Sequence, residues 1–141
     1  MFSYEKNFTP LFRDLKSLDK EVVILAMGEK TQEGFKNFFE KNFIEKLGNI
    51  YKYGKIEVQF CKFLSQEDYE ELINLTDFNF VRGEDSFIRA VLTGKPYLWH
   101  IYCQEDYAHM DKIEGFLDKY ERQMKGKTSE EYMSEYKKLF K

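Results

Sequence analysis

The segment best suited to chemistry runs from Asp77 to Ser86, where an apolar stretch passes through a glycine into a helical pattern. Gly83 allows a tight turn and a close approach of a ligand to the backbone. Arg82 adds a guanidinium, a planar cation that matches phosphate oxygens. Either Asp85 or Ser86 can cap the following helix, whose first amides and dipole favour an anion. The segment therefore predicts a seat for a pyrophosphate.

Glu84 is the residue of this segment that a phosphate seat does not explain. A carboxylate repels phosphate unless it points elsewhere. Glu84 can pair with Arg82, or it can face a substrate hydroxyl. The spacing alone is equally compatible with a capped helix that carries a surface ion pair, so a binding role and a structural role both stay open.

A second candidate segment, Phe63 to Tyr69, follows an alternating strand-like stretch. Gln66 and Tyr69 are about one helical turn apart, so both side chains can face the same cleft. Recognition of a nucleobase needs an aromatic face, which Phe63 or Tyr69 can supply, and edge hydrogen bonds, which Gln66 can supply. The alternative is that Tyr69 only packs against Leu64 at the start of a helix.

The remaining polar candidates are weaker indications of a catalytic or binding site. Gln104 follows a strand-like stretch and is placed to touch a ligand at the edge of a sheet. His100 and His109 have no Ser or Cys partner at a spacing typical of a nucleophilic triad, so we expect structural roles for both. Cys61 and Cys103 lie far apart and outside metal-ligand spacing. They are interpreted as reduced thiols of a cytosolic protein.

Short apolar runs alternate with amphipathic stretches along the chain, and this alternation predicts the elements that position these segments. Strands are expected at 2–4, 22–27, 55–61, 78–81 and 96–102, and helices at 8–16, 31–47, 65–75, 86–92, 108–120 and 128–139. The run 22–27 is rich in β-branched residues and predicts a strand buried on both faces. In the helix 31–47, Thr31 is the expected cap. Its expected buried stripe consists of Phe35, Phe38, Phe39, Phe43 and Leu47.

Strands separated by helices predict an α/β fold, a Rossmann-like doubly wound and mostly parallel sheet with helices on both faces. Ligands of such sheets bind beyond the carboxyl ends of the strands. We therefore expect the site in the loops after Tyr4, Met27, Phe60, Val81 and Tyr102.

Length and composition limit the classes of function. The 141 residues predict a single domain, 1–141, that ends in a helix over 128–141. A net charge of −3 without an evident basic face disfavours a nucleic-acid partner. The apolar runs are too short to span a membrane and no signal peptide opens the chain, so we expect a cytoplasmic protein. Aromatic residues make up 18%, which can fill a core or stack on ligand rings.

One stretch, Asn79 to Phe87, resembles the signature of a known family, the elongation factor P arginine rhamnosyltransferases (EarP). The resemblance continues through Arg89–Ala90, Gly94–Pro96, Trp99–Tyr102, Gln104 and Ala108–His109. The stretches 63–66 and 2–5 also resemble the family, so the likeness covers nearly all of the chain up to Tyr120. Cys103 departs from the pattern, because proline is expected there.

The resemblance implies the C-terminal half of a two-lobed glycosyltransferase of the GT-B type. Such an enzyme transfers rhamnose from dTDP-β-L-rhamnose to one arginine of elongation factor P and inverts the anomeric centre. The N-terminal lobe of the family, which carries two essential aspartates and most of the acceptor surface, is absent here. The chain is therefore expected to bind the donor without a metal or other cofactor, and to be inactive alone.

The resemblance also implies roles for individual residues. Glu84 is the acid of this lobe that turnover requires. The substrate-binding set is Phe2, Tyr4, Phe63, Gln66, Tyr69, Arg82, Asp85, Ser86 and Gln104. Two alternatives stay open: the donor lobe of another nucleotide-sugar glycosyltransferase, and a non-enzymatic nucleotide-binding or interaction module of flavodoxin-like shape.

Overall fold

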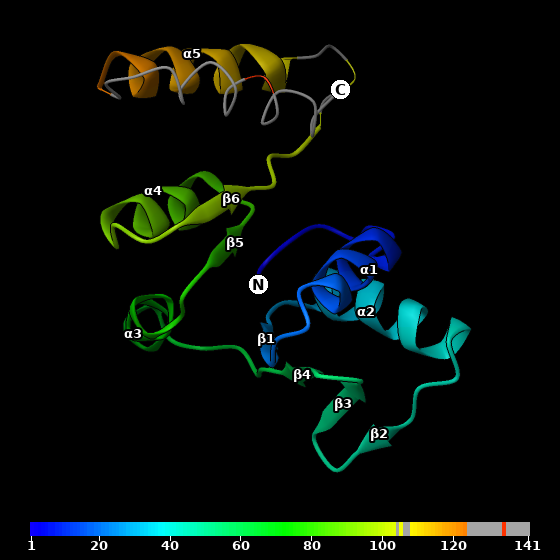
Figure 1. Ribbon diagram of the computed structural model, residues 1–141. Helices are drawn as coiled ribbons and strands as arrows, with labels where there is room; N and C mark the ends of the chain where they lie inside the picture. Colours follow the sequence, from blue (N-terminus) through cyan, green and yellow to red (C-terminus); the bar gives the residue numbers. More distant parts are fainter. Residues whose placement is uncertain (104, 106–107, 124–133, 135–141) are drawn as a thin grey trace. The chain divides into compact units, whose positions relative to one another are not determined.

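The computed structural model describes residues 1–103, 105, 108–123 and 134, and the chain divides into two compact units, Met1–His100 and Ile101–Lys141 (Figure 1). The helices of the first unit are α1 (Thr9–Ser17), α2 (Glu29–Lys41), α3 (Gln66–Leu75) and α4 (Glu84–Leu92). Its strands are β1 (Val22–Ala26), β2 (Lys46–Leu47), β3 (Ile50–Tyr53), β4 (Ile56–Phe60), β5 (Asn79–Val81) and β6 (Tyr97–Trp99). The described helix of the second unit is α5 (Ala108–Gln123). The expected helix over 128–141 lies outside the described residues.

The α/β class is confirmed, but the sheet is mixed rather than mostly parallel. Strands β2, β3, β4 and β1 form one sheet in the order β1-β4-β3-β2, in which only the β1–β4 pair is parallel. Strands β5 and β6 pair in parallel as a separate ladder. The antiparallel part comes from β2 and β3, which pair with each other and, through β3, with β4; the sequence predicts a helix end and a loop for these two strands.

The N-terminal segment connects the two ladders by backbone hydrogen bonds. The predicted strand 2–4 is reduced to a parallel bridge between Phe2 and Met27. The nitrogen of Met1 donates to the Leu25 carbonyl at 2.6 Å, and Met27 N donates to the Met1 carbonyl at 2.9 Å. On its other side, Phe2 N donates to the Phe80 carbonyl at 2.7 Å. This segment therefore holds the ends of β1 and β5 close together.

Helix α2 is shorter than predicted. It ends at Lys41, so Phe43 and Leu47 are 94% and 62% exposed and do not belong to the buried stripe. The side chain of Asn42 donates to the Phe38 carbonyl at 2.8 Å, and Phe43 then takes a φ of 54°, which turns the chain out of the helix. The helical spacing of the aromatic residues continues past this turn without a helix to carry it.

The beginning of α2 also differs from the prediction, because Gly28 and not Thr31 is the N-cap. Thr31 is buried in the first turn. Its hydroxyl accepts a hydrogen bond from Ser3 N at 2.8 Å and donates one to the Ser3 carbonyl at 2.9 Å. The hydroxyl therefore fastens the N-terminal segment to α2 instead of closing the helix end.

Aromatic side chains fill the core that α1 and α2 form with the larger sheet. Phe12 stacks on Phe38 with ring centroids 4.0 Å apart, and Phe8 stacks on Phe35 at 4.5 Å. The buried cluster consists of Phe8, Phe12, Ile24, Ala26, Phe35, Phe38, Phe39, Ile56 and Val58. Strand β1 is not buried on both faces as predicted, because Val23 is 60% exposed. A large part of the aromatic content therefore serves packing.

The N-termini of α3 and α4 are capped in different ways. Ser65 caps α3, and its hydroxyl accepts from Asp68 N at 3.1 Å. Helix α4 begins earlier than predicted, with Gly83 as its N-cap, so neither Asp85 nor Ser86 is the capping residue. The Ser86 hydroxyl reaches back from the first turn, accepting from Gly83 N at 3.0 Å and donating to the Gly83 carbonyl at 2.9 Å.

None of the described helices has the length and apolar character needed to cross a bilayer.

Candidate functional site

A cavity of about 670 Å³ lies in the first unit, beyond the carboxyl ends of β1, β4 and β5. Its walls are the loops that follow Met27, Phe60 and Val81, as expected for a sheet of this class, together with Phe2 from the N-terminal segment. A volume of this size is typical of sites for small molecules, at roughly 300–1,000 Å³. The lining residues include Gly28, Gln32, Cys61, Lys62, Phe63, Ser65, Gln66, Tyr69, Gly83, Asp85, Ser86 and Arg89.

The N-termini of α2, α3 and α4 all border this cavity. Their N-caps are Gly28, Ser65 and Gly83, and each is a lining residue. The first amides of a helix lack intrahelical partners and carry the positive end of its dipole. The cavity wall therefore favours a ligand that bears negative charge.

Gly28 lets the N-terminal segment close against the cavity. Its φ of +78° is a conformation that other residues rarely adopt. A Cβ at this position would lie 2.8 Å from Cε2 of Phe2. Glycine is therefore needed both for the turn into α2 and for the approach of the Phe2 ring.

Arg82 lies against the aromatic residues of the N-terminal segment. Its guanidinium carbon is 4.1 Å from the centroid of the Phe2 ring and 5.2 Å from that of Tyr4. One guanidinium nitrogen donates to the Ser3 carbonyl at 3.4 Å. Phe2 lines the cavity, whereas Arg82 and Tyr4 are not among its described lining residues. In this structure Arg82 therefore supports the cavity wall by a cation–π contact.

The other candidates of the Arg82–Ser86 turn divide between the cavity and the surface. Asp85 and Ser86 line the cavity. Glu84 is the first residue of α4 and is exposed, and it is not among the described lining residues. The structure therefore brings the Asp85 carboxylate and the Ser86 hydroxyl to the cavity and places Glu84 at the outer start of the helix.

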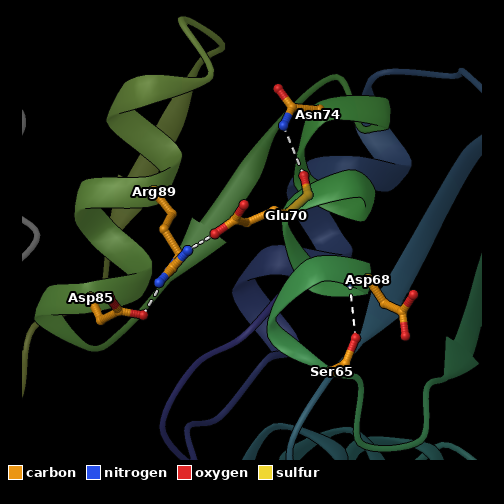
Figure 2. A network of polar contacts seen from close by, with 6 residues as sticks. All are labelled: Ser65, Asp68, Glu70, Asn74, Asp85 and Arg89. Atoms are coloured by element: carbon orange, nitrogen blue, oxygen red, sulfur yellow. Dashed lines mark hydrogen bonds and ion pairs between the residues drawn. The ribbon is translucent and has the colours of Figure 1, made fainter.

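Arg89 is a lining residue that the sequence analysis did not single out as a site residue. Its Nε lies 2.8 Å from Oδ2 of Asp85, and its guanidinium also forms an ion pair with Glu70 (Figure 2). The Gln66 amide is assigned with its oxygen towards the same guanidinium, because only in that orientation does it accept from Arg89, with Nη1 at 3.2 Å. Arg89 thus connects α4 to α3 across the cavity wall. The i,i+4 spacing of Asp85 and Arg89 is the signal in the sequence that could have indicated their ion pair.

The two aromatic candidates from the loop after β4 play different parts. Phe63 is fully exposed and lines the cavity, so its ring is available for stacking. Tyr69 meets Phe2 edge to face, with centroids 6.4 Å apart. Its buried hydroxyl has no hydrogen-bond partner among the described residues. Burial, followed by the nearby Asp85 carboxylate, raises the pKa of Tyr69.

Gln32 is a second residue that sequence reasoning missed, and its role is structural. Its side-chain nitrogen donates to the Ala26 carbonyl at 3.1 Å and to the Cys61 carbonyl at 2.8 Å. It therefore ties together the ends of β1 and β4.

Burial raises the pKa of the Cys61 thiol, which lines the cavity. The described part of the chain contains no group of three or more His, Cys, Asp or Glu side chains that could hold a metal ion.

His100 has the packing role expected of it. It is buried, and its Nδ1 accepts a hydrogen bond from Tyr4 N at 3.3 Å. Burial, with Lys6 and Arg82 nearby, lowers the pKa of His100 to about 4. The imidazole is therefore neutral at pH 7 and helps to hold the N-terminal segment. Gln104 lies outside the described residues.

Comparisons with known proteins agree on one family. The model of the family described as "Elongation-Factor P (EF-P) rhamnosyltransferase EarP" matches residues 1–140. The protein-arginine rhamnosyltransferase of Pseudomonas putida KT2440 is 49% identical over 74 residues, which is 52% of this chain and 20% of that protein. The corresponding protein of Neisseria meningitidis serogroup B is 42% identical over 72 residues, which is 51% of this chain and 19% of that protein.

A solved structure is also similar. It is described as "Structural basis for EarP-mediated arginine glycosylation of translation elongation factor EF-P". The TM-score is 0.72 at 28% sequence identity, and the alignment covers 92% of this chain and 40% of that one. The matched segments thus span about a fifth of the curated relatives, and the chain spans less than half of the solved structure.

Proposed function

Because this chain belongs to the EarP family of elongation factor P rhamnosyltransferases, we propose that its cavity binds the nucleotide-sugar donor of a protein-arginine rhamnosyltransferase. The donor is dTDP-β-L-rhamnose, and the acceptor is an arginine of elongation factor P. The observation that carries the proposal is a cavity beyond the carboxyl ends of β1, β4 and β5 that is bordered by the N-termini of three helices. Such a wall suits a ligand with an anionic diphosphate.

The thymine lies in the part of the cavity that follows β4. Phe63 offers an exposed ring face there, and the Phe2 and Tyr69 rings lie edge to face nearby. Gln66 supplies the hydrogen bond to the edge of the base. The Tyr69 hydroxyl, which is buried and has no partner among the described residues, is a further group that a bound nucleotide can satisfy.

The diphosphate lies at the start of α4. The first amides of that helix and the Ser86 hydroxyl face the cavity there, and Arg89 lies one turn further on. These groups stabilise the negative charge that grows on the diphosphate as the sugar leaves. Arg82 contributes its positive charge and holds Phe2 in place. The Asp85 carboxylate is kept from opposing the anion by its ion pair with Arg89.

The transfer itself needs an activated guanidinium. An arginine side chain stays protonated because its pKa is above about 12, so it is a poor nucleophile until a carboxylate orients it or takes a proton. The guanidinium nitrogen then bonds to the anomeric carbon from the face opposite the diphosphate, which departs with the bonding electrons, so the centre inverts. Glu84 is the acid of this lobe that takes part in turnover. The family's N-terminal lobe supplies the other carboxylates and most of the acceptor surface, so this lobe alone binds the donor and transfers no rhamnose.

Calorimetric titration of the 141-residue chain with dTDP tests the donor site. The wild type is expected to bind, and Arg82→Ala to bind at least about tenfold more weakly, a loss of about 1.4 kcal/mol. Arg13→Ala removes the same charge from an exposed position on α1 and should bind like the wild type. No binding in any variant would favour a module unrelated to nucleotides. Tighter binding of UDP than of dTDP would favour another nucleotide-sugar glycosyltransferase.

A further inference from the structure

The carboxamide of Gln66 is held in one orientation by its neighbour. Gln66 is the first residue of α3, and its side chain lines the cavity. The guanidinium of Arg89 carries only hydrogen-bond donors. The amide oxygen must therefore face Arg89, where Nη1 lies 3.2 Å away, because the reverse orientation would set the NH2 group against other N–H groups. This contact fixes which end of the amide is left for a ligand.

Arg89 is itself well fixed. Its Nε is 2.8 Å from the Asp85 carboxylate, and its guanidinium pairs with Glu70 on α3 (Figure 2). The Arg89 side chain is only 19% exposed. These contacts hold the plane of the guanidinium from both helices. With the oxygen taken up by Arg89, the NH2 group is the end of the Gln66 amide that is left for other partners. The cavity therefore receives a hydrogen-bond donor from Gln66 and no acceptor.

We propose that Arg89 is a positioning residue that makes Gln66 selective for one class of pyrimidine. The proposal rests on the donor site described above. Thymine and uracil carry a carbonyl acceptor at ring position 4, whereas cytosine carries an amino donor there. The fixed NH2 group of Gln66 hydrogen-bonds the carbonyl and opposes the amino group. A site that offers a fixed partner rejects the mismatched ligand because polar groups are then left unpaired.

The ratio of two affinities tests this role. With the 141-residue chain, dTDP is expected to bind at least about tenfold more tightly than dCDP, which corresponds to about 1.4 kcal/mol. In Arg89→Met the amide is free to rotate, so the ratio should fall to about threefold or less, even if both nucleotides bind more weakly. Arg89→Lys keeps a donor beside Gln66 and should retain most of the ratio. Arg13→Met should leave the ratio unchanged.

A second variant keeps the test independent of any loss of stability in Arg89→Met. Gln66→Glu offers a carboxylate with no donor, which still pairs with Arg89, so the preference should reverse towards dCDP. A purely structural Arg89 would weaken both nucleotides equally. An unchanged ratio in Arg89→Met, or a Gln66→Glu variant that still prefers dTDP tenfold, would overturn the inference while the donor site stands. If the wild type bound neither nucleotide, the donor site and this inference would both be lost.

Discussion

At the scale of single residues, several side chains of the N-terminal segment and its partners hold the cavity wall. Phe2 packs against Gly28 on one side and beneath Arg82 on the other. Tyr4 is held through its backbone by His100. These contacts link the N-terminal segment to the ends of distant strands, so changes in them should affect stability as well as ligand binding.

Gly28→Ala is expected to destabilise the chain by about 2–4 kcal/mol, because the new Cβ adds steric conflict with Phe2 to an unfavourable φ. Gly48→Ala is the matched control. Gly48 also has a positive φ, of +61°, but nothing lies within 4 Å of its added Cβ. It should therefore cost only about 1–2 kcal/mol. Urea unfolding measures both, and equal losses would show that the contact with Phe2 is unimportant.

His100 predicts a pH dependence of stability. Its pKa is lowered from 6.5 to about 4 in the folded chain, so the unfolded chain binds the proton more tightly. The stability that this group contributes is fully present above pH 6.5 and declines as the pH falls towards 4. His100→Asn, which keeps a hydrogen-bond acceptor for Tyr4 N, should lose less stability across this window than the wild type. Parallel pH profiles for the two proteins would contradict the assignment.

At the scale of elements, sequence periodicity predicted most helices and strands. It failed where contacts between segments distant in sequence determine the secondary structure. Helices α1, α3 and α5 and strands β1, β4 and β5 lie close to their predicted ranges. The hairpin β2–β3 was missed because helical spacing continues by coincidence through Phe43 and Leu47. This segment forms strands because β3 pairs with β4, a pairing that periodicity does not reveal.

Because sequence patterns do not reveal contacts between distant segments, only part of the candidate site could be predicted. The rule that ligands bind beyond the carboxyl ends of strands selected three loops that line the cavity. Arg89 was not selected because its role depends on Glu70 and Gln66, which belong to another helix. Arg82 was expected at the ligand because its charge is evident in the sequence, but its stacking on Phe2 follows only from the folded N-terminal segment.

The corrected end of α2 gives a prediction for two phenylalanines. Phe39→Ala should cost about 3–5 kcal/mol, because Phe39 is 1% exposed in the core and its loss leaves a cavity. Phe43→Ala should change the free energy of unfolding by no more than about 0.5 kcal/mol, because Phe43 is 94% exposed. Chemical denaturation measures the free energy of unfolding of both variants. A comparable loss for both would mean that α2 continues through Phe43 as its spacing suggests.

At the scale of the whole molecule, the chain carries a cavity and a wall suited to an anion, but it spans less than half of the similar solved structure. The proposed division of labour follows from this. In the proposed function, this chain holds the donor, and other parts of a complete enzyme supply the remaining catalytic groups. Glu84 is exposed at the start of α4 and is not among the described lining residues of the cavity, so its proposed role lies in turnover rather than in nucleotide binding.

Joining this chain to the N-terminal lobe of a family member allows the role of Glu84 to be measured. Glu84→Ala in the joined protein should reduce rhamnose transfer to elongation factor P by at least about a thousandfold, roughly 4 kcal/mol of transition-state stabilisation. Its affinity for dTDP should change by less than about threefold. Glu71→Ala, which removes an exposed acid of α3 that is not among the described lining residues, serves as the control. Transfer at the unmodified rate would remove Glu84 from the mechanism.

The location of the nucleotide is the central claim, and NMR mapping of backbone amides during a dTDP titration tests it most directly. The account predicts that the largest shifts fall at Gly83–Ser86, at Phe63–Gln66 and at Gly28. The smaller hollow lined by Glu5, Asn37 and Lys41 should show little change. Shifts concentrated around that hollow, with none at the start of α4, would contradict the assignment of the donor site.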